Sequence, residues 1–111
     1  MTLSTVLVVD DEESIRDLIR SKLTQEGRHV LLAARGQEAI EVFRRHRPHI
    51  TILDLHMPEM NGIEVLRQIR AVDPQAVVMI FTGAETEALA RQARELGVTE
   101  FIQKGLSLPP V

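Results

Sequence analysis

Short apolar runs and amphipathic stretches alternate along this chain. A continuous apolar run occupies residues 6–9; it is rich in β-branched residues and is stopped by two acids. Such a run is typical of a strand that is buried on both faces. From Ile15 to Leu23 the apolar residues recur at helical spacing with charged residues between them. That spacing predicts an amphipathic helix, and Gly27 is a fitting residue for its end.

The same alternation continues along the chain and predicts five strands and four helices. The predicted strands are residues 6–9, 29–33, 50–53, 76–81 and 98–103, and the predicted helices are residues 15–23, 36–46, 61–72 and 85–96. Pro48 keeps the second helix from continuing, and Gly97 is the expected residue just beyond the fourth. The last strand is the most polar, which suits a sheet edge. Strict alternation implies a doubly wound α/β fold, with a parallel sheet, right-handed crossovers and helices on both faces.

Composition narrows the class of protein. The 111 residues form one predicted domain, 1–111, and 44% of them are hydrophobic. The absence of cysteine excludes disulfides, zinc–thiolate sites and thiol catalysis. A net charge of −3 and only 3% aromatic residues argue against direct binding of nucleic acid. No signal peptide or membrane-spanning run is evident, so we expect a cytoplasmic protein without membrane contact.

The carboxyl-terminal residues suggest an incomplete layer. Residues 105–111 read as a tail or as the start of a truncated fifth helix. A complete fifth helix is expected to cover the same face of the sheet as the first helix. The apolar surface under it is therefore expected to be bare, or covered by a partner or by further sequence.

Polar residues gather where the predicted strands end. The first strand is followed by Asp10-Asp11-Glu12, the third by Asp54, the fourth by Thr82 and the fifth by Lys104. The carboxyl ends of parallel strands lie at one edge of the sheet, where such folds bind their ligands. The agreement across four strands predicts a functional site at this edge.

Carboxylates dominate the predicted site. Asp10, Asp11 and Asp54 in one crevice would repel one another unless a cation compensates them. Oxygen ligands without cysteine suit Mg²⁺ or Mn²⁺. The alternative is that Asp10-Asp11 is a solvated turn or a helix cap. Asp54 is the candidate nucleophile for an acyl phosphate, with a purely metal-binding role as its alternative.

Three further residues have both a functional and an ordinary interpretation. Lys104 can bind phosphate oxygens, or it is a solvated loop lysine. Thr82 can donate a hydrogen bond to a phosphoryl oxygen, or it simply ends a strand or caps a helix. His56 lies close enough in sequence to Asp54 to affect access by water, or it is a plain exposed loop residue. The four histidines show no zinc-binding spacing.

The combination resembles the receiver domains of two-component signalling. The segments VLVVDDEE, ILDLHMPEMNG, FTG and FIQK occur in the family's order at the ends of the expected strands, and the resemblance covers nearly the whole chain. The roles it implies are metal binding for Asp10 and Asp11, phosphoacceptor and metal ligand for Asp54, metal binding through its backbone carbonyl for His56, switch hydroxyl for Thr82, phosphate binding for Lys104, and switch aromatic for Phe101.

The resemblance also implies a fold and partners. The fold is flavodoxin-like, with strand order 2-1-3-4-5. The phosphodonor is a sensor histidine kinase or a phosphotransfer protein, and the cofactor is Mg²⁺. The chain is then a signalling switch that catalyses only its own phosphorylation and dephosphorylation, acting on an unknown output domain or effector. Two departures from the family are Gly105, where a proline is common, and the missing fifth helix, which leaves dimerisation and effector contact open.

Two rival functions remain at this point. A small aspartyl phosphatase of the haloacid-dehalogenase-like kind would place a D-x-D motif after the first strand, whereas this chain has Asp10-Asp11-Glu12 there. A pseudo-receiver would keep the fold as a binding module without phosphotransfer, and Gly105 is one feature that favours it. No Gly-rich nucleotide-binding motif follows the first strand.

Overall fold

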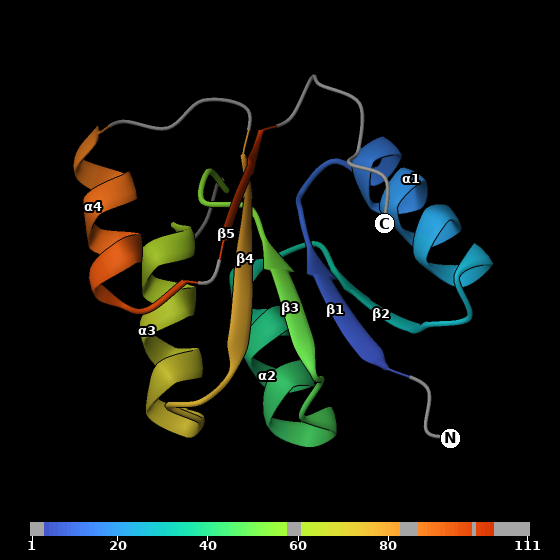
Figure 1. Ribbon diagram of the computed structural model, residues 1–111, viewed down its shortest axis with the longest axis horizontal. Helices are drawn as coiled ribbons and strands as arrows, with labels where there is room; N and C mark the ends of the chain where they lie inside the picture. Colours follow the sequence, from blue (N-terminus) through green and yellow to red (C-terminus); the bar gives the residue numbers. More distant parts are fainter. Residues whose placement is uncertain (1–3, 58–60, 83–86, 99, 104–111) are drawn as a thin grey trace.

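The strands and helices alternate as the hydrophobic pattern predicts (Figure 1). The computed structural model describes residues 4–57, 61–82, 87–98 and 100–103. The strands are β1 (Thr5–Val9), β2 (His29–Ala33), β3 (Ile50–Leu53), β4 (Val77–Thr82) and β5 (Glu100–Gln103). The helices are α1 (Glu13–Gln25), α2 (Gly36–His46), α3 (Gly62–Val72) and α4 (Glu87–Glu95).

All five strands are parallel and lie in the order β2-β1-β3-β4-β5. This order confirms the doubly wound, flavodoxin-like prediction, with β5 at one edge. Val9 is paired with Ala33 of β2 on one side and with Leu53 of β3 on the other. Strands β1 and β3 are therefore neighbours that end at the same level, which brings the residues that follow them together.

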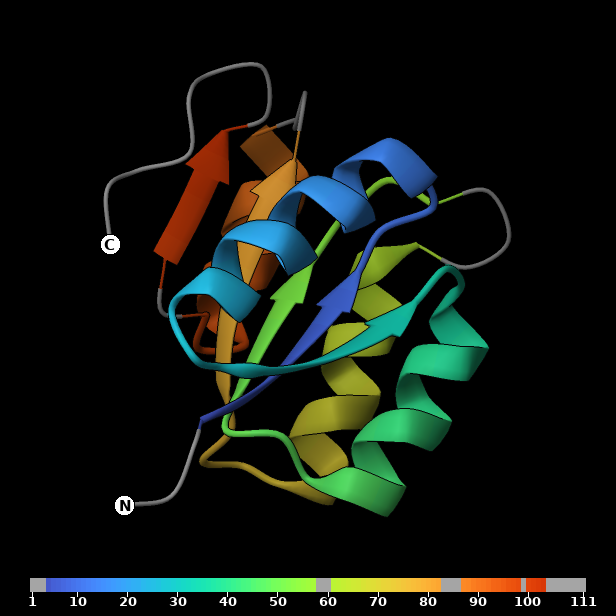
Figure 2. The same cartoon turned by 90° about the vertical axis from the view of Figure 1, so that its right-hand side faces the viewer.

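Helices cover the two faces of the sheet unequally. Figure 2 shows α1 in front of the sheet and α2 and α3 behind it. The larger core cluster lies between the sheet and the helices α2, α3 and α4, and it contains Phe43, Leu66 and Ile69, each at most 1% exposed. Among the described residues, the cluster beneath α1 has only five buried members. The α1 face is therefore the thinner half of the core.

Helix ends follow the predicted stop signals. Gly27 and Gly97 adopt the positive φ angles (81° and 78°) that favour glycine beyond a helix end. Helix α2 ends at Arg47, which is also left-handed, just before Pro48. The fifth strand begins at Glu100, later than the predicted residue 98, because the Val98 N–H instead bonds to the Ala93 carbonyl and closes the end of α4.

The prediction of a truncated fifth helix falls on residues outside those described, as does the 105–111 tail of the predicted domain. Within the described residues, no helix is long and apolar enough to cross a bilayer.

Candidate functional site

Asp10 is held in place by hydrogen bonds to its backbone and to its carboxylate. Its N–H continues the ladder to β2 through the Ala33 carbonyl (3.1 Å). Its Oδ1 accepts a hydrogen bond from the Glu12 N–H (2.9 Å), and its own carbonyl accepts one from Nη1 of Arg16 (2.8 Å). The side chain is only 1% exposed. A buried carboxylate with a fixed orientation is suited to binding a cation, because its desolvation has to be compensated.

Asp54 occupies the equivalent position on the neighbouring strand. Its N–H bonds to the Val9 carbonyl (2.9 Å), so the ladder between β1 and β3 extends one residue beyond Leu53. Its Oδ1 accepts a hydrogen bond from the His56 N–H (3.0 Å), and the residue is 2% exposed. Asp10 and Asp54 thus lie side by side at the carboxyl edge of the sheet, as predicted.

The acidic run after β1 has the donor set of a hard cation. Carboxylate oxygens of Asp10, Asp11 and Glu12 all lie within 4.8 Å of one another. Asp10 is buried, whereas Asp11 and Glu12 are exposed, so the group faces solvent on one side. These oxygens fit Mg²⁺, which binds few carboxylates and retains several waters. Glu12 was not predicted as a ligand, although the DDEE run brings it next to the pair.

The predicted ligands Asp54 and His56 lie outside this close group of acids. Among the described residues, Asp54 is not a member of this close group of acids; it approaches from the adjacent strand. The imidazole of His56 is exposed, and its backbone N–H contacts the Asp54 carboxylate. Its carbonyl stays a predicted ligand.

The turn between β3 and α3 brings two backbone segments into close contact. The Gly62 N–H bonds to the Leu55 carbonyl (2.9 Å). A Cβ added at Gly62 would lie 2.5 Å from both the Asp54 carbonyl oxygen and the Leu55 Cα. Asn61 caps α3 by accepting a hydrogen bond from the Glu64 N–H (3.0 Å). Gly62 therefore allows this segment to lie directly against the backbone of Asp54 and Leu55.

The remaining predicted residues are placed only in part. Thr82 is the last residue of β4, paired with Gln103, while its hydroxyl lies outside what the structure describes. Lys104 also lies outside the described residues. Phe101 is half-buried against the larger core cluster, and the guanidinium carbon of Arg94 lies 5.1 Å from its ring centroid. This inward, half-buried position is compatible with the predicted switch aromatic.

Sequence reasoning missed two supporting residues. Arg16 holds the Asp10 carbonyl, and Gly62 permits the close approach to Asp54. The sequence gives no indication of the role of Arg16, because it is one of several charged residues on an amphipathic helix. The close contact of Gly62 with Asp54 was not evident from the sequence, because it depends on how two backbone segments approach one another in space.

Comparisons with known proteins agree with this geometry. The model of the response regulator receiver domain family matches residues 6–109. The chemotaxis protein CheY of Thermotoga maritima is 34% identical over 100 residues, which are 89% of this chain and 83% of that protein. Sporulation initiation phosphotransferase F of Bacillus subtilis is 29% identical over 96% of this chain and 86% of its own length.

Solved structures give the same result. The CheY chain in the CheX–CheY–BeF₃–Mg²⁺ complex of Borrelia burgdorferi superposes with a TM-score of 0.87. It is 32% identical and covers 94% of this chain and 80% of its own. The sheet order, the paired acids at the carboxyl edge and the family match over most of the sequence lead to one conclusion: this chain belongs to the response regulator receiver domain family of two-component systems.

Proposed function

We propose that this chain is a phospho-accepting switch, in which Asp54 receives a phosphoryl group from a histidine kinase or a phosphotransfer protein. The observation that carries the proposal is the adjacency of Asp10 and Asp54, two nearly fully buried acids at the ends of neighbouring strands. A buried acid pair is costly to maintain unless a charged ligand uses it. Family membership supports the same function.

In the proposed reaction, a carboxylate oxygen of Asp54 attacks the phosphorus of a phosphohistidine. A P–O bond forms, the P–N bond breaks, and the leaving imidazole nitrogen takes up a proton. The His56 N–H holds Oδ1 of Asp54, which fixes the carboxylate before attack and lowers the cost of orientation. Hydrolysis of the acyl phosphate by water then resets the switch.

Asp10, Asp11, Asp54 and the His56 carbonyl would hold Mg²⁺. When bound, the ion would neutralise charge on the phosphoryl oxygens. The family member from Borrelia burgdorferi was crystallised with Mg²⁺ and BeF₃, a fluoride complex of phosphoryl-like shape, which supports this assignment. Glu12 shares the acidic cluster and contributes negative charge to it.

Lys104 and Thr82 would bind the phosphoryl oxygens, and Phe101 would turn further inward as Thr82 moves. Such a switch shifts a pre-existing equilibrium between two conformations. An output domain or effector would then recognise the shifted surface. Phe101 is half-buried against the larger core cluster, so a change at this residue would reach both the core and the surface.

Intact-mass spectrometry after incubation with a small acyl-phosphate donor tests the proposal. We expect one phosphoryl adduct that requires Mg²⁺, is lost in Asp54→Ala and persists in Asp17→Ala, a matched exposed acid on α1. No adduct on the folded wild-type chain would indicate a pseudo-receiver. Sustained turnover of a generic phosphate ester would instead indicate a phosphatase.

A further inference from the structure

Two different contacts hold the ring of Phe101. The residue is paired with Ile80 of β4 and packs against the larger core cluster, in which Ile80 is fully buried. In addition, the guanidinium carbon of Arg94, in the last turn of α4, lies over the ring at 5.1 Å from its centroid. A cation within about 6 Å of a ring centroid is attracted by the negative face of the ring. The ring is therefore held both by apolar packing and by a charge.

The backbone that carries Arg94 is fixed relative to this core. The Arg94 carbonyl accepts a hydrogen bond from the Gly97 N–H (2.9 Å), and the Ala93 carbonyl accepts one from the Val98 N–H (3.3 Å). These are the two bonds of a helix end that requires a left-handed residue, here Gly97 with a φ of 78°. Ala93 is itself buried in the larger core cluster. The side chain of Arg94 therefore starts from an anchored point beside the ring.

The guanidinium of Arg94 is available to the ring. Arg94 is exposed, and among the residues that the structure describes it takes part in no ion pair. Arg70, by contrast, donates to the carbonyls of Leu96 and Gly97 at the same end of α4. The two arginines thus have different tasks there, since Arg70 contacts the main chain and Arg94 contacts a side chain.

We propose that Arg94 is a positioning residue that holds Phe101 in the observed arrangement and so opposes the switch; this rests on the proposed function, in which Phe101 is the switch aromatic. When the ring turns further inward, it leaves the guanidinium and loses the attraction. An exposed contact of this kind changes an equilibrium constant by a factor of about two to five. Arg94 therefore sets how readily a phosphoryl group shifts the chain to its other conformation.

Ring signals of phenylalanine provide the first test. The chain has three Phe and neither Tyr nor Trp, so NMR of ring-labelled Phe is simple to interpret, and Phe101→Leu assigns the signals of residue 101. Arg94→Met keeps an unbranched apolar side chain and removes the charge. It should move the Phe101 signals and leave those of Phe43 unchanged. Arg94→Lys should restore most of the wild-type spectrum, because a cation is again present.

Arg91→Met is the matched control. Arg91 is exposed on the same helix, three residues earlier, and its loss changes the net charge equally. Its Phe101 signals should match those of the wild type. Circular dichroism verifies that each variant is folded.

A titration with beryllium fluoride in the presence of Mg²⁺ tests the effect on the switch. Arg94→Met should bind beryllium fluoride about two to five times more tightly than the wild type, because less of the binding energy is used to move the ring. Arg94→Lys and Arg91→Met should bind it as the wild type does. The Phe101 ring signals report the bound fraction in each variant.

Three results would overturn the proposal. The first is an unchanged Phe101 spectrum in Arg94→Met. The second is the same change in Arg91→Met, which would make net charge the cause. The third is equal affinity of Arg94→Met and the wild type for beryllium fluoride, which would leave a contact with no influence on the switch. Failure of the proposed function is recognised separately: beryllium fluoride would shift no signal in the wild-type chain, and the switch role of Arg94 would be refuted with it.

Discussion

The guanidinium of Arg16 joins α1 to the acidic run after β1 by donating a hydrogen bond to the Asp10 carbonyl. Arg16→Ala should loosen that turn and weaken Mg²⁺ binding about tenfold, as loss of groups that orient metal ligands commonly does. The chain has no Trp or Tyr, so amide NMR shifts are the suitable readout of a Mg²⁺ titration.

Arg20→Ala is the matched control for Arg16. Arg20 lies on the same helix and pairs with Asp17 at 3.4 Å, with both side chains about half exposed. We expect its Mg²⁺ affinity to stay within twofold of the wild type, roughly the effect of one surface charge. Equal weakening in both variants would mean that net charge matters and the carbonyl contact does not.

Gly62 is the second residue whose contact supports the site. In Gly62→Ala the new Cβ would meet backbone atoms of Asp54 and Leu55 at 2.5 Å, so the turn has to move. Overpacking of this kind costs about 1–3 kcal/mol of unfolding free energy. Urea denaturation measures that loss, and the rate of adduct formation on Asp54 should fall with it.

Gln37→Ala, at an exposed position of α2, serves as the reference for Gly62→Ala. Its effect on the unfolding free energy should be within about 0.5 kcal/mol, as for most surface substitutions. A Gly62→Ala protein as stable and as readily phosphorylated as this reference would show that the turn has more space than its backbone contacts indicate.

At the scale of elements, Arg70 of α3 ties together segments that are distant in sequence. Its guanidinium donates hydrogen bonds to the carbonyls of Ala76, just before β4, and of Leu96 and Gly97, just after α4. Arg70→Ala should lower the unfolding free energy by about 2–3 kcal/mol, because two partly buried carbonyls and one exposed carbonyl lose a charged donor. Urea denaturation provides the measurement.

Arg67, three residues earlier on the same helix, is the natural comparison for Arg70. Its guanidinium is exposed and lies 3.6 Å from Glu64, so Arg67→Ala should cost less than about 1 kcal/mol. Hydrogen exchange should also become faster around Leu96 and Gly97 in Arg70→Ala alone. Similar costs for the two variants would contradict a joining role for Arg70.

Elements could be predicted from the sequence because their signals are local. Apolar periodicity, together with stops such as Gly27 and Gly97, predicted the five strands and four helices. Boundaries were less accurate where a backbone hydrogen bond decides them, as at Val98. The Arg70 contacts carried no signal, since their acceptors are main-chain carbonyls that every residue possesses.

The site was predictable to the extent that parallel strands end at one edge. Asp10 and Asp54 could be brought together from strand order alone, and the structure has them on adjacent strands. The contacts that support these two acids could not be predicted. Arg16 donates a hydrogen bond to a main-chain carbonyl and Gly62 packs against main-chain atoms, and neither contact leaves a pattern in the sequence. The types of side chain thus indicate the chemistry of the site, while the contacts that hold those side chains in place depend on three-dimensional packing.

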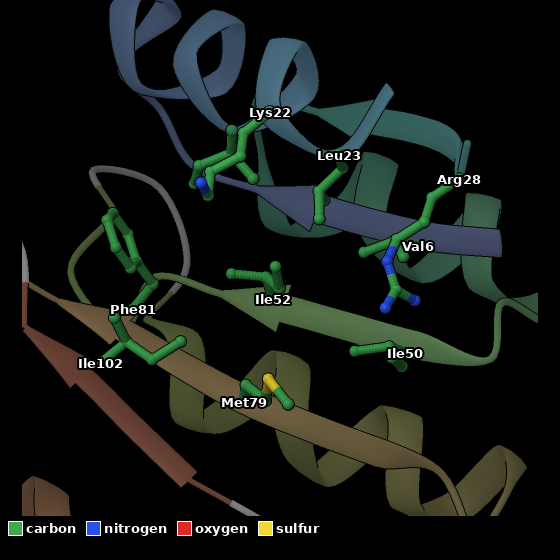
Figure 3. A pocket seen from close by; sticks show the side chains of 10 residues that line it. Val6, Lys22, Leu23, Arg28, Ile50, Ile52, Met79, Phe81 and Ile102 are labelled. Carbon is green, nitrogen blue, oxygen red and sulfur yellow. The ribbon is translucent and has the colours of Figure 1, made fainter. Parts of the chain in front are cut away.

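At the scale of the whole molecule, the two faces of the sheet are covered unequally, so substitutions at adjacent residues of one strand should differ in their cost to stability. Ile80 and Met79 are neighbours on β4 whose side chains point to opposite faces. Ile80 is fully buried in the larger core cluster. Met79 is half-buried and, with Phe81 and Ile102, lines an apolar groove on the α1 face of the sheet (Figure 3). Ile80→Ala should therefore cost about 3–4 kcal/mol of unfolding free energy, the usual range for a cavity in a packed core.

Met79→Ala should cost only about 1 kcal/mol, because its side chain loses less buried area and leaves no closed cavity. Urea denaturation of both variants gives the difference directly. Equal costs at the two positions would mean that the described residues of the α1 face are packed as tightly as those of the opposite face.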